Sequence, residues 1–152
     1  MIGNYDANGL KFAYPENWKV REACAGCPKE IIVESPSGAF LSLHIYPEDS
    51  SPAQIVEEAI RSLRDEYEDR GIELRPYSGE LVSGGPVAGG YDVSFSLLDF
   101  IVHVQLRCFR HDERTILSIW QAEDREFDRL RRVALAMLLS LVSANSVGVQ
   151  TE

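Results

Sequence analysis

The sequence predicts an α+β domain in which a central antiparallel β-sheet of about six to eight strands is flanked by two main α-helices. Two segments carry apolar residues at helical spacing, and most other segments alternate apolar and polar residues, as half-buried strands do. Short turns join the late strand segments and make them antiparallel neighbours, because a parallel crossover needs about a dozen residues or more. The order of strands, helix, strands and helix is typical of the α+β class.

The first predicted helix begins at Ser50-Ser51-Pro52, where serine can cap the helix and proline suits its first turn. It ends near Gly71, since glycine commonly follows the last helical residue. The expected buried stripe consists of Ile55, Val56, Ala59, Ile60, Leu63 and Tyr67.

The second predicted helix runs from about Asp124 to Val142, with acidic residues in its first turns that favour the positive end of the helix dipole. Leu135 and Leu139 widen its apolar stripe, so we expect its C-terminal half to be covered on more than one side. The single domain is expected to span residues 1–145, with a flexible tail over 146–152. The expected buried stripe consists of Phe127, Leu130, Ala134, Met137, Leu138 and Leu141.

The remaining segments are predicted as strands separated by turn residues. Ser35-Pro36-Ser37-Gly38 predicts one hairpin, and Ser83-Gly84-Gly85-Pro86 and His111-Asp112-Glu113 predict later turns. Gly89-Gly90 is also interpreted as part of a turn. The predicted strands are Leu10–Tyr14, Trp18–Val20, Ile31–Glu34, Phe40–Tyr46, Ile72–Leu81, Gly90–Leu98, Ile101–Arg110 and Thr115–Gln121.

The net charge of -9 argues against nucleic acid and anionic membranes as partners. No basic run exceeds the pair Arg131-Arg132, and no segment reaches the roughly 18 consecutive apolar residues that a membrane helix needs. The first six residues contain no signal-peptide pattern, and three cysteines are an odd number that disfavours a disulfide framework. We therefore expect a protein of the reducing cytoplasm with a protein or peptide partner, no nucleic acid and no membrane insertion.

The opening segment from Asn8 to Trp18, NGLKFAYPENW, resembles the signature with which PsbP-like and Mog-type domains begin. In that signature an amphipathic strand ends at a proline turn and a tryptophan starts the next strand. The resemblance implies a central antiparallel sheet flanked by helices and a non-catalytic binding protein, chaperone-like in some bacterial relatives. It transfers no residue-level binding motif to this chain.

Cys24-Ala25-Gly26-Cys27-Pro28 is the most conspicuous local motif, since a CxxC pair can act in redox chemistry or bind zinc. A redox pair normally begins a helix, whereas strand-like residues follow Pro28, and a structural zinc site would need a second Cys/His pair. We expect an ordinary loop here. No Gly-x-Ser-x-Gly elbow is present, and Gly84-Gly85-Pro86 lacks the ending of a phosphate loop.

The late strands combine aromatic and polar residues on one predicted face, which is typical of recognition surfaces. Cys108 lies in the alternate register and is expected to be buried. The face contains Ile101, His103, Gln105, Arg107 and Phe109, extended by Ile116, Ser118 and Trp120 and by Phe40, Ser42, His44 and Tyr46. The simpler interpretation of each histidine is that it lies on the surface or is a sheet residue whose hydrogen bonds are made within the protein. The candidate binding residues are Tyr46, His44, His103, Arg107, Phe109 and Trp120, with Phe109, Trp120 and Tyr46 expected on a concave, partly exposed surface.

We therefore expect a non-catalytic binding or adaptor protein that holds a protein or small ligand on its sheet face, with no cofactor and no bound metal. Two alternatives stay open. One is a metal- or thiol-dependent enzyme or redox protein built on His44 and His103 or on Cys24 and Cys27. The other is a structural subunit of a larger assembly, with a homodimer allowed.

Overall fold

Nine strands and two helices make up the residues that the computed structural model describes, which are 1–23, 29–80 and 87–150, with side chains described as far as Ser143. The strands are β1 (Ile2–Ala7), β2 (Leu10–Pro15), β3 (Lys19–Ala23), β4 (Lys29–Glu34), β5 (Phe40–Pro47), β6 (Glu73–Pro76), β7 (Gly89–Leu97), β8 (Phe100–His111) and β9 (Arg114–Glu123). The helices are α1 (Pro52–Tyr67) and α2 (Asp124–Gln150). Neither of these described helices is long and apolar enough to cross a membrane.

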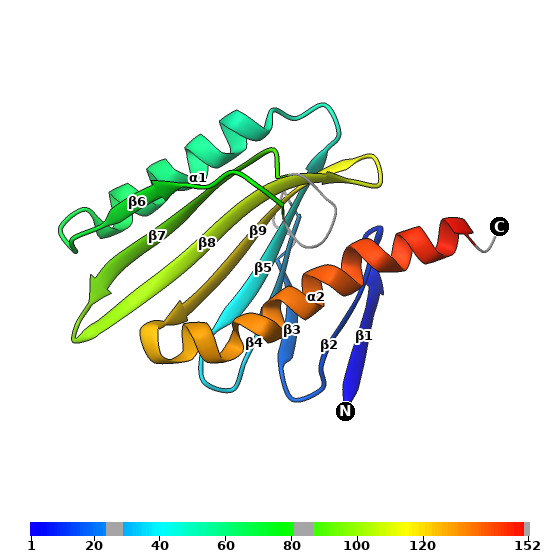
Figure 1. The fold of residues 1–152 in the computed structure, drawn as a ribbon, viewed down its shortest axis with the longest axis horizontal. Helices are drawn as coiled ribbons and strands as arrows, with labels where there is room; N and C mark the ends of the chain where they lie inside the picture. The colour runs from blue at the N-terminus through cyan, green and yellow to red at the C-terminus, as the bar shows by residue number, and fades with distance from the viewer. Residues whose placement is uncertain (24–28, 81–86, 151–152) are drawn as a thin grey trace.

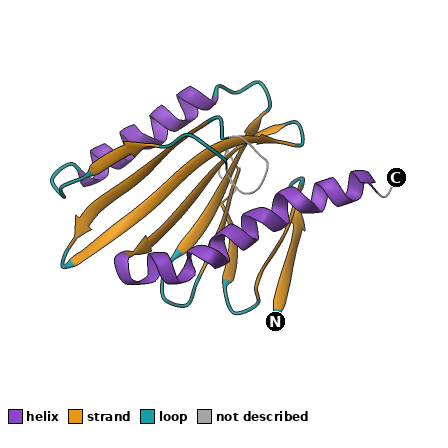
Figure 2. Cartoon of the chain, in the orientation of Figure 1, coloured by secondary structure: helices purple, strands orange, loops and turns teal. Residues whose placement is uncertain are grey.

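Seven strands form one sheet in the order β3-β4-β5-β9-β8-β7-β6, and β1 and β2 form a separate two-stranded sheet. Every pairing is antiparallel. Figure 1 shows α1 beside β6 and β7 and α2 running across the sheet from the end of β9 to the β1–β2 hairpin. Figure 2 shows the same arrangement by secondary structure, with the long helix crossing the strands. The predicted α+β fold is confirmed.

Strand β1 is missing from the sequence prediction. It pairs with β2 through Asn8 and Gly9, both with positive φ (54° and 78°), and Ala7 lies opposite Leu10. An Asn-Gly pair with these angles is the preferred two-residue hairpin turn, because its backbone twist matches that of the strands. The rings of Tyr5 and Phe12 stack across the hairpin at 5.0 Å. The turn signal was therefore present in the sequence although β1 itself contains weak strand formers.

Helix α1 begins as predicted, because the Ser51 side chain accepts a hydrogen bond from the backbone N–H of Gln54 at 3.3 Å. It packs on β7, β8 and β9. The rings of Tyr67 and Phe95 stack at 3.8 Å in this layer. The buried residues of the α1 core are Ile55, Val56, Ile60, Val93, Phe95, Val102, Val104, Leu106, Cys108 and Leu117.

Helix α2 covers the opposite face and packs on β2, β8 and β9. The Ser140 hydroxyl accepts a hydrogen bond from the backbone N–H of Ala13 at 2.9 Å, which ties the helix to β2. Leu135 and Leu139 are 36% and 42% exposed, so the expectation of a second cover over this half of α2 is wrong. The helix also continues to Gln150 rather than ending near Val142. The buried helix residues of the α2 core are Ala134, Met137, Leu138 and Leu141.

Two other predicted boundaries differ from the structure. Strand β6 covers Glu73–Pro76 and is shorter than the predicted Ile72–Leu81. Gly89 and Gly90 open β7 instead of forming a turn, and a side chain at Gly90 would lie 2.5 Å from the Leu106 carbonyl oxygen. Gly90 therefore permits β7 to approach β8 closely. The predicted Ser83–Pro86 turn lies outside the described residues.

Replacing Leu41 by alanine should lower the free energy of unfolding by about 2–5 kcal/mol, because Leu41 is 1% exposed in the α2 core and its loss leaves a cavity. The matched control is Leu139→Ala on the open side of α2, which should change that free energy by less than about 0.5 kcal/mol. Urea denaturation followed by circular dichroism measures both. Equal effects of the two substitutions would contradict the assignment of the core.

Candidate functional site

The strand register divides the six candidate residues between the two faces of the sheet. Arg107 lies opposite Ser118 and Gln105 opposite Trp120, so β8 and β9 share a face as predicted, and this face lies toward α2. His44 lies opposite Leu117, whose side chain belongs to the α1 core. The predicted extension of the face by Phe40, Ser42, His44 and Tyr46 is therefore wrong, because these residues lie on the α1 side.

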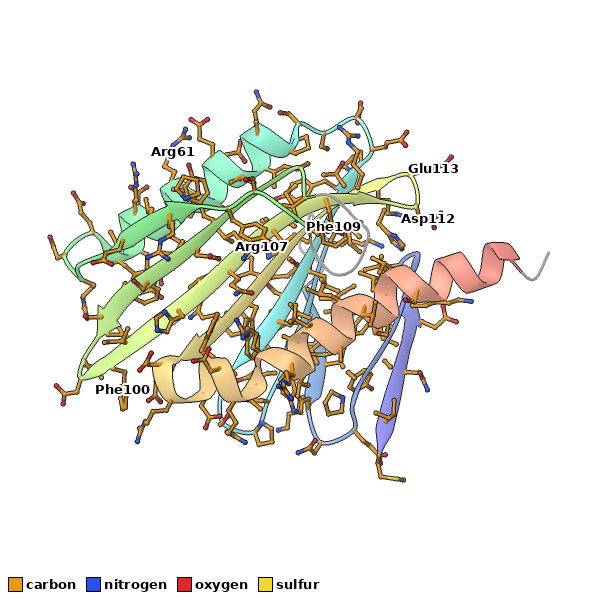
Figure 3. The ribbon with its side chains drawn as sticks, viewed as in Figure 1. Arg61, Phe100, Arg107, Phe109, Asp112 and Glu113 are labelled. Atoms are coloured by element: carbon orange, nitrogen blue, oxygen red, sulfur yellow. The ribbon has the colours of Figure 1, made fainter. Side chains whose placement is uncertain are left out.

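Phe109 and Trp120 are buried in the α2 core, at 3% and 2% exposure. The Trp120 ring stacks with Trp18 at 6.4 Å, and its indole N–H has no hydrogen-bond partner among the described residues. Figure 3 shows Phe109 toward one end of β8 and Phe100 at the other end. The expectation that Phe109 and Trp120 lie on a partly exposed concave surface is wrong, and both residues stabilise the core.

His103 and Arg107 already have partners within the protein. His103 Nε2 lies 2.7 Å from an Asp124 carboxylate oxygen. The Arg107 guanidinium lies 2.8 Å from the Asp92 carboxylate and 3.5 Å from the centre of the Tyr77 ring, and it donates to the carbonyl oxygens of Tyr91 and Leu106. Arg107 is only 8% exposed. These contacts tie β7, α2 and the segment after β6 to β8.

The uncovered part of the α1 face contains a groove with a volume of about 360 Å³, which we call the α1 groove. Helix α1 packs on β7, β8 and β9, and the groove lies between this helix and the strands β4, β5 and β9. Two of the candidate residues, His44 and Tyr46, line it. The lining residues are Glu30, Phe40, Ser42, His44, Tyr46, Ile55, Glu58, Ala59, Ser62, Leu63, Leu106, Leu117, Ile119 and Gln121.

Ser42, His44 and Glu30 form a line of polar contacts on the floor of the groove. Ser42 Oγ lies 3.2 Å from His44 Nε2, and the same nitrogen lies 3.5 Å from a Glu30 carboxylate oxygen. A catalytic triad needs the serine and the acid on different ring nitrogens, so that one orients the imidazole while the other loses its proton. Ser42 is also almost fully buried, at 1% exposure. The arrangement suits polar recognition and structural support.

Burial controls the ionisation of the aromatic and imidazole groups in the groove. Burial lowers the pKa of His44 below its usual value of 6.5, and the Glu30 carboxylate opposes that effect. Burial raises the pKa of Tyr46, and the carboxylates of Glu58 and Glu30 and the thiol of Cys108 raise it further. Near neutral pH the groove therefore contains a neutral tyrosine, an imidazole biased towards its neutral form and two carboxylates.

The alternative of a metal or thiol site receives no geometric support from the described residues. His44 and His103 lie on opposite faces, and no group of three or more potential metal ligands occurs in the described part of the chain. Burial raises the pKa of the Cys108 thiol to about 11, which makes it a poor nucleophile, as its strand register predicted. Cys24 and Cys27 lie outside the described residues.

Sequence reasoning missed Glu30 and Glu58 as site residues. Glu58 lies outside the predicted buried stripe of the first helix, and Glu30 lies just before the predicted strand that starts at Ile31. Strand alternation was the signal that could have found Glu30. Ile31 and Val33 are buried in the α2 core, so Glu30, Ile32 and Glu34 lie on the opposite face of the strand.

The His44→Gln variant should lose less stability on acidification than the wild type. Because the pKa of His44 is lowered by folding, the unfolded chain binds the proton first, and the free energy of unfolding falls as pH drops through about 6.5. Removing the imidazole removes this contribution. Urea midpoints at pH 7.5 and 5.5 measure the difference, and Glu30→Gln should show a steeper loss than the wild type. An equal acid effect in all three proteins would refute the role of His44.

Comparisons with known proteins identify the fold. No protein-family model and no curated protein matches the chain. Among solved structures, the chain is similar to cyanobacterial PsbP (CyanoP) from Synechocystis sp. PCC 6803, with a TM-score of 0.63, 12% identity and coverage of 91% of this chain and 90% of that one. It is also similar to a Bacteroides thetaiotaomicron VPI-5482 protein, with a TM-score of 0.56, 12% identity and coverage of 87% and 44%. A third structure is the protein of unknown function PA94 from Pseudomonas aeruginosa, with a TM-score of 0.52, 10% identity and coverage of 93% and 96%. At these identities the likeness concerns the fold, and the chain folds as a PsbP-like α+β domain.

Proposed function

We propose that this chain is a non-catalytic binding module that holds a polypeptide segment or a small ligand in the α1 groove. The observation that carries the proposal is the groove itself, which lies where α1 does not extend over β4 and β5 on its own face of the sheet. Its volume of about 360 Å³ falls within the range of ligand sites, which is about 300–1,000 Å³.

The lining supports binding because it combines apolar contact area with a few directional groups. Phe40, Leu63 and Ile119 supply apolar surface, while the Gln121 amide can donate and accept hydrogen bonds and the Glu30 carboxylate can accept them. Such a combination is typical of sites that hold a ligand in one orientation. The Ser42–His44–Glu30 geometry does not provide an activated nucleophile, which favours binding over catalysis.

Three broader expectations remain proposals that rest on sequence features. The odd number of cysteines favours a reducing compartment such as the cytoplasm. The opening motif favours kinship with Mog-type as well as PsbP-like domains. A homodimer or a larger assembly is compatible with the fold, and light scattering of the purified protein tests it.

The variant Ser62→Trp should weaken ligand binding about tenfold or more, because an indole at this α1 position fills the groove. Ligands are selected from a random twelve-residue peptide library displayed on phage, and their affinities are measured by fluorescence anisotropy. The matched control is Arg61→Trp, on an exposed position of the same helix that does not line the groove and is labelled in Figure 3. It should change affinity less than about twofold. Selection of no peptide, or equal weakening by both variants, would defeat the proposal.

A further inference from the structure

The lining of the α1 groove contains carboxylates but neither lysine nor arginine. Glu30 on β4 and Glu58 on α1 lie on opposite walls. His44 does not cancel their charge near neutral pH, because burial favours its neutral form. The groove therefore has a negative potential that a positively charged occupant would neutralise.

Tyr46 places an aromatic ring near both carboxylates. Glu30, Glu58 and Tyr46 all line the groove, and both carboxylates raise the pKa of the Tyr46 hydroxyl group. A cation can lie over the face of a tyrosine ring, and the aliphatic stem of a lysine or arginine can cover apolar surface such as Ile119 and Leu63. The groove thus offers contacts for both parts of a basic side chain.

Two arginines, one on β3 and one on α1, pair with carboxylates other than those of the groove. Arg21 on the edge strand β3 lies 3.7 Å from the Glu34 carboxylate, and Arg61 on α1 lies 3.2 Å from Glu57. Neither arginine lines the groove. The carboxylates of Glu30 and Glu58 are therefore not neutralised by an arginine or lysine within the described part of the chain, beyond the contact of Glu30 with His44.

A second depression shares one lining residue with the groove. Tyr46 also lines a second depression of about 670 Å³ at the end of β5, beside the β8–β9 turn. Its acidic residues Glu48, Asp112 and Glu113 outnumber its basic residues Lys29 and Arg114. An occupant that extends along β5 from the groove into this depression would remain on acidic surface.

We propose that the occupant of the α1 groove is an extended peptide segment that inserts a lysine or arginine side chain between Glu30, Glu58 and Tyr46. This inference rests on the proposed function, since it names the chemistry of the segment that the groove binds. The cationic head lies between the two carboxylates, and the aliphatic stem lies on the apolar floor.

The test uses two fluorescein-labelled octapeptides of alternating leucine and a charged residue, which is lysine in one and glutamate in the other. The wild-type protein should bind the lysine peptide at least about tenfold more tightly, measured by fluorescence anisotropy at 50 and 300 mM NaCl, with weaker binding at the higher salt. The Glu30→Gln/Glu58→Gln double variant should weaken binding of the lysine peptide roughly fivefold to tenfold. The matched control, Glu57→Gln/Glu68→Gln, makes the same change in net charge at positions outside the groove and should change affinity less than about twofold.

Each result that differs from these expectations would refute a different part of the proposal. Equal affinity for the two peptides, with both blocked by Ser62→Trp, would leave the groove as a binding site but refute its preference for cations. Equal weakening by the two double variants would assign the effect to net charge alone. Displacement of the lysine peptide by spermidine at an equal concentration would identify a free polyamine rather than a peptide as the ligand. Binding of the lysine peptide that Ser62→Trp leaves unchanged would refute both the inference and the proposed function.

The comparison of the two peptides needs only the wild-type protein, so it decides the charge preference even if the double variant does not fold.

Discussion

Strands β8 and β9 bury apolar side chains on both faces, and the rest of the fold depends on covering each face. On β8, Leu106 and Cys108 are buried towards α1, while Phe109 is buried towards α2. On β9, Leu117 is buried towards α1 and Ile116 is buried towards α2. A sheet of this kind needs a layer on each side, and the two helices supply these layers. Both helices contact β8 and β9, but α1 extends to β7 while α2 extends to β2. Because α1 does not extend over β4 and β5, the α1 groove lies beside these strands on the α1 face.

Local patterns in the sequence were sufficient for the fold class and for most of the elements. Period-two alternation and tight turns predicted the strands after α1, and the cap at Ser51 marked the helix start that the structure shows. Strand β1 was missed because four of its six residues, Gly3, Asn4, Asp6 and Ala7, are weak strand formers and its pairing depends on the Asn8-Gly9 turn. The covering of Leu135 and Leu139 was misjudged because an apolar stripe on a helix does not show how many layers pack against it.

The candidate site was harder to predict, because the pairing of β5 with β9 joins segments distant in the sequence. Side chains alternate between faces, so a change of one residue in register moves a whole strand pattern to the other face. The sequence could not show whether His44 would lie opposite Leu117 or opposite Ser118, and this decides whether His44 joins His103. Similarly, mixed polarity around Arg107 did not distinguish a free recognition group from one already paired with Asp92. Two of the six candidates, His44 and Tyr46, line the groove.

The position of Trp120 on β9 has a consequence for spectroscopy. The chain contains two tryptophans, Trp18 and Trp120, and they stack in the α2 core, whereas the neighbouring residues Ile119 and Gln121 line the groove on the reverse side of the same strand. The sheet thus separates both indole fluorophores from any molecule in the groove, which excludes quenching by direct contact. A change in intrinsic emission during a titration would instead report displacement of the β9 backbone.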